Sequence, residues 1–156
     1  GAFTAPVTAT DNGSGIALLE VYDAATSSTV NVVNASTRAY VGTGDSVLIP
    51  GFVISGTGAL KLLIRAVGPT LSDLGVTGVL ADPTITLYRG ATVLATNDNW
   101  LATDTATMVA AGAFALPAGS RDAAIVTTLA AGSYTAIVSG VGNTTGTALV
   151  ELYVVN

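Results

Sequence analysis

The chain has 156 residues, about the length of one domain, and half of them are hydrophobic while only 10% are charged. This balance excludes an intrinsically disordered chain, which needs low hydrophobicity and high net charge. The sequence contains no histidine and no cysteine, so it lacks the commonest general base and any thiol nucleophile, thiolate metal ligand or disulfide. The net charge of −5 opposes binding to nucleic acid, whose phosphates need a basic surface. We therefore expect a protein without enzymatic activity or cofactor.

Short runs rich in β-branched residues, bounded by Gly, Pro, Asn and Asp, fill most of the chain. They predict strands at 3–9, 15–23, 29–41, 46–55, 60–67, 84–89, 91–96, 122–129, 133–140 and 146–155. Turns are expected at 11–13, at 56–58 and at Arg89-Gly90, the last two closing hairpins. Short helical turns are expected only at 70–74 and 104–111. The fold class is all-β, a jelly-roll or immunoglobulin-like β-sandwich of about ten short strands with at most two short helical turns.

An internal repeat is the strongest signal in the sequence, because residues 1–23 match residues 132–154 without a gap. The residues that recur identically 131 positions later are Gly1, Thr4, Ala5, Val7, Asn12, Gly15, Ala17, Leu18, Glu20 and Tyr22. Each copy has the pattern of a β-hairpin, and a sandwich needs such a hairpin only once to close its sheet. We therefore divide the chain into an N-terminal hairpin, 1–23, and a β-sandwich module, 24–156.

Two interpretations of the repeat remain open. The first copy either completes its own sandwich or packs on a neighbouring copy of the chain by strand addition, in head-to-tail contacts that do not close. The second interpretation makes the apolar side chains of the first copy candidate inter-subunit residues, namely Phe3, Val7, Ala17, Leu18, Leu19, Val21 and Tyr22.

Several motifs resemble known modules. The runs Leu18-Leu19-Glu20-Val21-Tyr22-Asp23, Val41-Gly42-Thr43-Gly44-Asp45 and Leu63-Ile64-Arg65-Ala66-Val67-Gly68-Pro69 resemble a repeat module of very large secreted bacterial surface proteins. The second half, from Asp82-Pro83 to Tyr134-Thr135, is similar to the bacterial pre-peptidase C-terminal domain. That family is a jelly-roll-like sandwich appended to secreted proteases, with no catalytic residues to transfer. Both resemblances imply an extracellular or cell-surface location.

Clustered side-chain oxygens at Asn97, Asp98 and Asn99, with Asp104 nearby, form a weak candidate calcium site. The alternative is a structural turn, in which these side chains bond to the backbone and Trp100 covers the core. A low density of carboxylates favours the turn.

Arg65 lies inside an apolar strand, which is an unusual place for a charge. Strand alternation places it on the solvent side. The alternative is a buried guanidinium paired with Asp73, Asp82 or Asp122, because an unpaired buried charge is too costly.

These observations predict a non-enzymatic extracellular structural protein, the subunit of a surface filament or sheath that assembles through terminal hairpins. Its expected partner is itself, with no nucleic acid, and no apolar run is long enough for a membrane-spanning helix. The alternative is a binding module of a tandem-repeat adhesin, with surface glycans or another ligand as its partner.

Overall fold

The computed structural model describes residues 1–11, 13–23 and 31–155. They belong to two compact units, Gly1–Asn31 and Val32–Asn156. The described residues of the first unit form no strand, so the strands expected at 3–9 and 15–23 are absent. An isolated two-stranded hairpin is marginally stable in water, which explains their absence. Asn12 of the expected turn at 11–13, and positions 29 and 30 of the expected strand 29–41, lie outside the described residues.

The second unit is built on an antiparallel sheet, which confirms the all-β class. Its strands run in the order β1-β6-β2-β5-β3-β4. Their bounds are β1 (Asn34–Val41), β2 (Gly51–Val67), β3 (Pro83–Arg89), β4 (Thr92–Asn97), β5 (Ala123–Gly140) and β6 (Gly146–Val154). The described residues form fewer strands than expected, partly because expected strands are joined. The expected strands 46–55 and 60–67 largely merge into β2, and 122–129 and 133–140 merge into β5.

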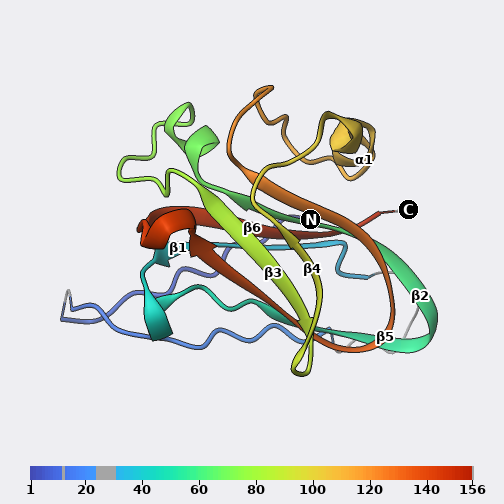
Figure 1. Ribbon diagram of the computed structural model, residues 1–156. Coiled ribbons are helices and arrows are strands. Elements are labelled where there is room, and N and C mark those ends of the chain that lie inside the picture. The colour runs from blue at the N-terminus through green and yellow to red at the C-terminus, as the bar shows by residue number, and fades with distance from the viewer. Residues whose placement is uncertain (12, 24–30, 156) are drawn as a thin grey trace. The chain divides into compact units, whose positions relative to one another are not determined.

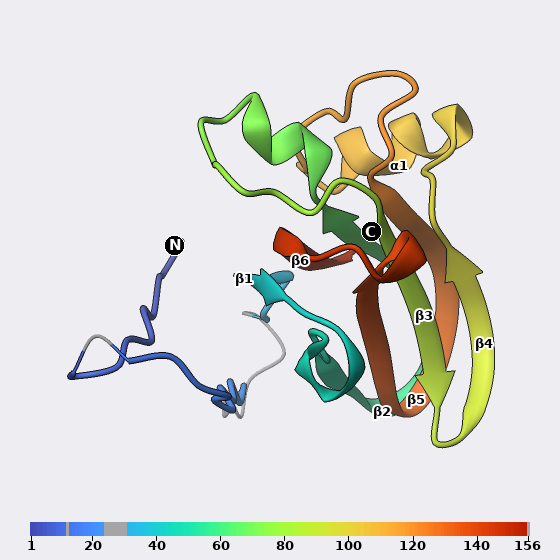
Figure 2. The ribbon, with the colours of Figure 1, turned by 60° about the vertical axis from the view of Figure 1, so that its left-hand side comes forward.

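Strands β2 and β5 bend together and pass from one layer of the sandwich to the other (Figures 1 and 2). Residues 51–54 pair with 132–135 and residues 59–66 pair with 123–130, with a register shift between Ile54 and Ala59. Gly56 and Gly58 lie in this shift with φ of 93° and 122°, which glycine adopts without strain. The prediction of a hairpin at 56–58 is therefore wrong, because the glycines bend one strand instead of reversing the chain. The hairpin expected at 132–154 is also wrong, because residues 132–140 belong to β5 and residues 146–154 to β6, and these two strands are not neighbours in the sheet.

The main core lies between the two layers. One layer contains β1, β6, the second half of β2 and the first half of β5, and the other contains the remaining halves with β3 and β4. Alternate residues of β2 face this core, as the burial of Leu62, Ile64 and Ala66 shows. Ile85 and Leu87 of β3 and Val138 of β5 face them from the other layer.

A second apolar cluster covers the outer face of the first layer, which explains why β2 is buried on both faces from 62 to 67. Leu63 and Val67 of β2 meet Leu71, Met108 and Leu116 there. The covering segments include the 3₁₀ turns η2 (Pro69–Ser72) and η3 (Ala102–Asp104) and the helix α1 (Thr105–Ala110). These are the two helical regions that the sequence predicts, and further 3₁₀ turns occur at η1 (Gly44–Ser46) and η4 (Val141–Asn143). Within the described residues, no helix has the length and apolar character needed to cross a bilayer.

Candidate functional site

A buried ion pair joins β2 to β6 on the outer face of the first layer. Arg65 of β2 lies opposite Glu151 of β6 in the strand register. The guanidinium is fully buried, and its Nε donates a 2.9 Å hydrogen bond to Oε2 of Glu151, which is 5% exposed. Nη2 of Arg65 forms the salt bridge with the same oxygen. Nη1 donates to the carbonyl oxygen of Phe114 at 2.6 Å, so the charge is held from two sides.

Two aromatic rings complete the environment of this pair. The guanidinium carbon of Arg65 lies 4.3 Å from the ring centre of Phe114 and 5.8 Å from that of Tyr153. The Tyr153 hydroxyl donates to Oε1 of Glu151 at 2.7 Å. Burial, together with this hydrogen bond and the nearby carboxylate charge, raises the pKa of Tyr153 from 10.0 to about 12. Because Arg65, Glu151 and Tyr153 are buried under the covering segments, this cluster is not accessible to a substrate.

The solvent-side placement of Arg65 is wrong, since residues 100–116 supply side chains that cover this face of the strand. The partner is also different from the three aspartates expected. Asp122 binds backbone and hydroxyl groups, and Asp82 pairs at 3.1 Å with the exposed Arg121. Asp73 lies on the surface. The sequence signal that could have identified Glu151 is the Glu-x-Tyr pattern at the end of both repeat copies.

Asp122 is a second buried polar centre, and it anchors the loop after β2. Its Oδ1 accepts hydrogen bonds from the backbone N–H of Gly68 at 2.8 Å and of Thr70 at 3.4 Å. Its Oδ2 accepts from the Thr70 hydroxyl and, at 2.7 Å, from that of Ser120. Ser120 in turn accepts a 3.0 Å hydrogen bond from the Trp100 indole. These bonds satisfy the carboxylate, so its role is structural.

Two of the four candidate calcium residues, Asn97 and Asp104, bind backbone groups with their side chains, and Asp98 and Asn99 are exposed. Asn97 Oδ1 accepts a 2.9 Å hydrogen bond from the Ala124 N–H, and its Nδ2 donates to the carbonyl oxygen of Asn99 at 2.9 Å. Asp104 Oδ2 accepts from the Leu101 N–H at 3.2 Å. Among the described residues, no group of three or more His, Cys, Asp or Glu side chains is placed to hold a metal. These contacts favour the structural turn, and Trp100 packs against the second apolar cluster as that interpretation expects.

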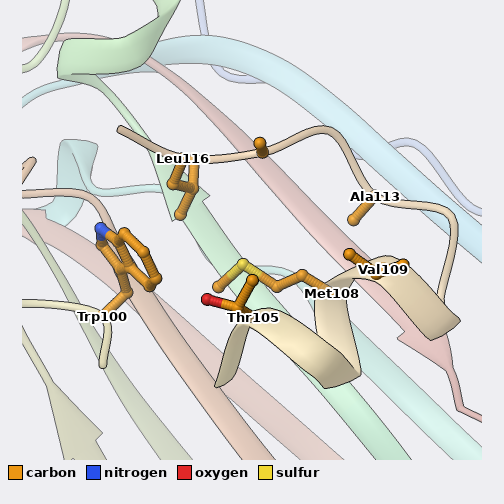
Figure 3. Close-up of a pocket in the computed structure, with 7 residues that line it drawn as sticks. Trp100, Thr105, Met108, Val109, Ala113 and Leu116 are labelled. Atoms are coloured by element: carbon orange, nitrogen blue, oxygen red, sulfur yellow. The ribbon is translucent and has the colours of Figure 1, made fainter. Parts of the chain in front are cut away.

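A small hollow lies beside this turn, between Trp100, Met108 of α1 and Leu116 (Figure 3). Thr105 and Val109 of α1 contribute to its wall. Its volume is about 60 Å³, whereas pockets for small ligands measure about 300–1,000 Å³. The hollow is therefore too small to enclose a sugar.

The apolar residues of the N-terminal copy are exposed, in contrast to their counterparts in the C-terminal copy. Phe3 is 96% exposed and Tyr22 is 79% exposed, whereas the aligned Tyr134 and Tyr153 are 4% and 9% exposed. All seven candidate inter-subunit residues, Phe3, Val7, Ala17, Leu18, Leu19, Val21 and Tyr22, are exposed. Their association with another chain stays a prediction.

Strand β1 stands at one end of the sheet order and pairs with β6. Its residues alternate between a side that faces the main core, where Val41 is buried, and an outer side that holds Arg38 and Tyr40. Tyr40 is 66% exposed and Arg38 is also exposed. On the core side, Thr37 and Ala39 are only half-buried. The sandwich is therefore incompletely covered at this strand.

No family model matches this chain, and no curated protein matches it. Among solved structures, the chain is similar to the pre-peptidase C-terminal domain of collagenase from Bacillus anthracis, with 14% sequence identity and a TM-score of 0.48. The similarity covers 77% of this chain and 89% of that domain. The resemblance of the second half to the pre-peptidase C-terminal domain thus recurs in the structural comparison at low identity, and the resemblance to a repeat module of surface proteins stays a prediction.

Proposed function

We propose that this chain is a non-enzymatic extracellular structural module that associates with copies of itself through residues 1–23 and builds a surface filament or sheath. One observation carries the proposal. A similar sequence occurs twice, with ten of 23 positions identical. Residues 132–154 supply part of β5 and β6, where the alternate apolar side chains are buried in the sandwich, whereas the described residues of 1–23 are exposed. Exposed apolar residues that have buried counterparts need a cover, and without one they favour aggregation.

The size of the hydrophobic term supports this proposal. Leu18 is 84% exposed and Val21 is 74% exposed. Full burial of one such side chain contributes about 1.5–3 kcal/mol, so burying several together offsets much of the cost of association. The low content of charged residues, 10%, also reduces repulsion between identical copies.

The non-enzymatic part of the proposal rests on the chemistry of the chain. Histidine and cysteine are absent from the sequence, and the buried groups Arg65, Glu151 and Asp122 are engaged in hydrogen bonds inside the fold. An extracellular location is proposed on the resemblance to secreted modules. The adhesin alternative, with a glycan ligand, stays a prediction.

The test compares two matched double variants of the full chain. Leu18→Ser with Val21→Ser removes apolar groups from the first unit. Leu101→Ser with Val109→Ser is the control in the second unit, where these residues are 59% and 71% exposed. Assembly is followed by light scattering and negative-stain electron microscopy.

We expect the wild type and the control to form fibres and the Leu18/Val21 variant to remain monomeric with an unchanged β-sheet circular dichroism spectrum. A wild type that stays monomeric at all concentrations contradicts the proposal. So does equal assembly of the two variants.

A further inference from the structure

The second half of the N-terminal copy, residues 15–22, is called the donor segment here. If it is extended, its side chains alternate between two faces. One face carries Gly15, Ala17, Leu19 and Val21, and the other carries Ile16, Leu18, Glu20 and Tyr22. The aligned residues of β6 place Ala148 and Val150 in the main core and Glu151 and Tyr153 on the outer face. The donor segment therefore has one small apolar face and one face with a single charge.

The first candidate binding position for the donor segment is the one that β6 occupies, between β1 and β2 of another copy. Glu20 and Tyr22 already form the hydrogen bond seen between Glu151 and Tyr153, at 2.9 Å instead of 2.7 Å. However, each copy has one such place, and its own β6 occupies it. An exchange would uncover one apolar strand for each one it buries, and it would yield no net gain in buried area.

The preceding residues of the N-terminal copy also differ from those that the sandwich requires. Pro6 is aligned with Ile137, which lies in β5 and pairs with Thr86 of β3. Proline has no N–H to donate and suits an edge. Ala9 is aligned with Gly140, where a Cβ atom would lie 2.1 Å from the Thr144 carbonyl oxygen. The N-terminal copy is therefore adapted to a place other than the interior of the sheet.

The edge of β1 is a second candidate, because among the described strands only β6 pairs with β1 and its other edge has no strand beside it. On the core side of β1, Thr37 and Ala39 are half-buried. The small apolar face of an added donor segment would cover these two residues and extend the main core. The outer side has exposed Arg38 and Tyr40. Glu20 is the one charged residue of the donor segment, and Arg38 is the one charged residue of β1. A strand added here gains main-chain hydrogen bonds and buries apolar area without displacing β6.

We propose that the donor segment of one copy adds to the edge of β1 of a second copy, with Glu20 beside Arg38. This proposal rests on the proposed function and specifies the contact by which the copies join. Because donor segment and β1 edge lie on the same chain, each copy donates once and accepts once. Such head-to-tail contacts extend into a fibre unless the rotation between copies closes a ring.

The test is an exchange of charges between full-length chains. Glu20→Arg alone places two arginines side by side at the contact, and Arg38→Glu alone places two glutamates there. Each single variant should raise the protein concentration needed for assembly by about tenfold, since opposite charges across strands stabilise and like charges destabilise. Both residues are exposed, so the fold should stay intact. Asp73→Arg and Lys61→Glu are the matched controls at exposed charges of the second unit and should leave assembly unchanged.

Mixing the two single variants in equal amounts should restore assembly. The introduced arginine of one variant then meets the introduced glutamate of the other, and the unchanged Glu20 of the second meets the unchanged Arg38 of the first. The double variant that combines Glu20→Arg with Arg38→Glu should also assemble by itself. High salt should reduce the difference between wild type and single variants by screening the charges.

Three results would overturn the proposal. Assembly that needs the apolar residues of 1–23 but ignores both charge reversals leaves the proposed function in place and removes this contact. Recovery in the double variant but not in the mixture shows pairing within one chain. Loss of assembly in Gly15→Ala together with normal assembly in Arg38→Glu points to the place of β6, where a Cβ on the aligned Gly146 would lie 2.6 Å from the Leu80 nitrogen.

Discussion

The two copies of the repeat show how much of a strand comes from its neighbours. Residues 146–154 form β6 between β1 and β2, whereas the described residues of 1–23 form no strand although they share ten of 23 positions with 132–154. Ala148 is fully buried, and the aligned Ala17 is exposed. Sheet formation therefore depends on cross-strand packing more than on the local sequence. Paired variants at aligned positions can measure this difference.

The largest difference is expected between Glu151→Ala and Glu20→Ala. Loss of Glu151 leaves Arg65, which is fully buried, without its counter-charge and should cost about 3–5 kcal/mol. Glu20 is exposed, so its removal should leave stability unchanged. Urea unfolding of dilute protein measures both. Equal midpoints for the two variants would show that the buried pair contributes no more than an exposed carboxylate.

The next difference is expected between Gly146→Ala and Gly15→Ala. A Cβ at Gly146 would lie 2.6 Å from Leu80 N and from Val79 backbone atoms, whereas at Gly15 it would meet nothing within 4 Å. Overpacking of this kind costs about 1–3 kcal/mol. In thermal unfolding, the midpoint temperature of Gly146→Ala should lie clearly below that of the wild type, and the midpoint of Gly15→Ala should equal it. A normal transition for Gly146→Ala would mean that the 79–80 segment moves aside easily.

Local patterns predicted the parts of the fold that depend on local chemistry. The expected strands 84–89 and 91–96 correspond to β3 and β4, and Gly90 at the turn between them has φ of 58°. The bend in β2 was mistaken for a hairpin because glycines at 56 and 58 permit both. Which one forms depends on the partner β5, whose register continues on both sides of the shift.

The polar site was harder to predict because it depends on the register between distant strands. Arg65 and Glu151 lie 86 positions apart, and no local pattern relates them. The sequence allowed two states for Arg65, facing solvent or buried with a charged partner, and the structure shows the second. The partner could not be chosen without knowing that β2 pairs with β6. Glu-x-Tyr in both copies was the available signal.

A smaller, pH-dependent difference is expected between Tyr153→Phe and Tyr22→Phe. Burial, with the hydrogen bond to Glu151, raises the pKa of Tyr153 to about 12, whereas an unfolded tyrosine ionises near 10. Between these values the unfolded chain loses a proton that the folded chain retains, so stability should fall as pH rises from about 10 to 12. Tyr153→Phe should weaken this fall, and Tyr22→Phe should leave it unchanged. The measurement is the denaturant midpoint of each variant and of the wild type at several pH values between about 10 and 12. The same decrease of the midpoint with pH in both variants would contradict this prediction.

The smallest effect on stability is expected from deleting residues 1–23. Their described side chains are all exposed, and both apolar clusters belong to the second unit. Changes confined to an exposed surface usually alter stability by less than about 0.5 kcal/mol, so the thermal midpoint should move by only about 1–2 °C. The truncated chain should keep its β-sheet circular dichroism spectrum and remain monomeric at concentrations where the full chain assembles. Failure to fold would mean that residues 1–23 complete their own sandwich. Fibres of the truncated chain would mean that another surface joins the copies, because the exposed copy of the repeat is then unnecessary.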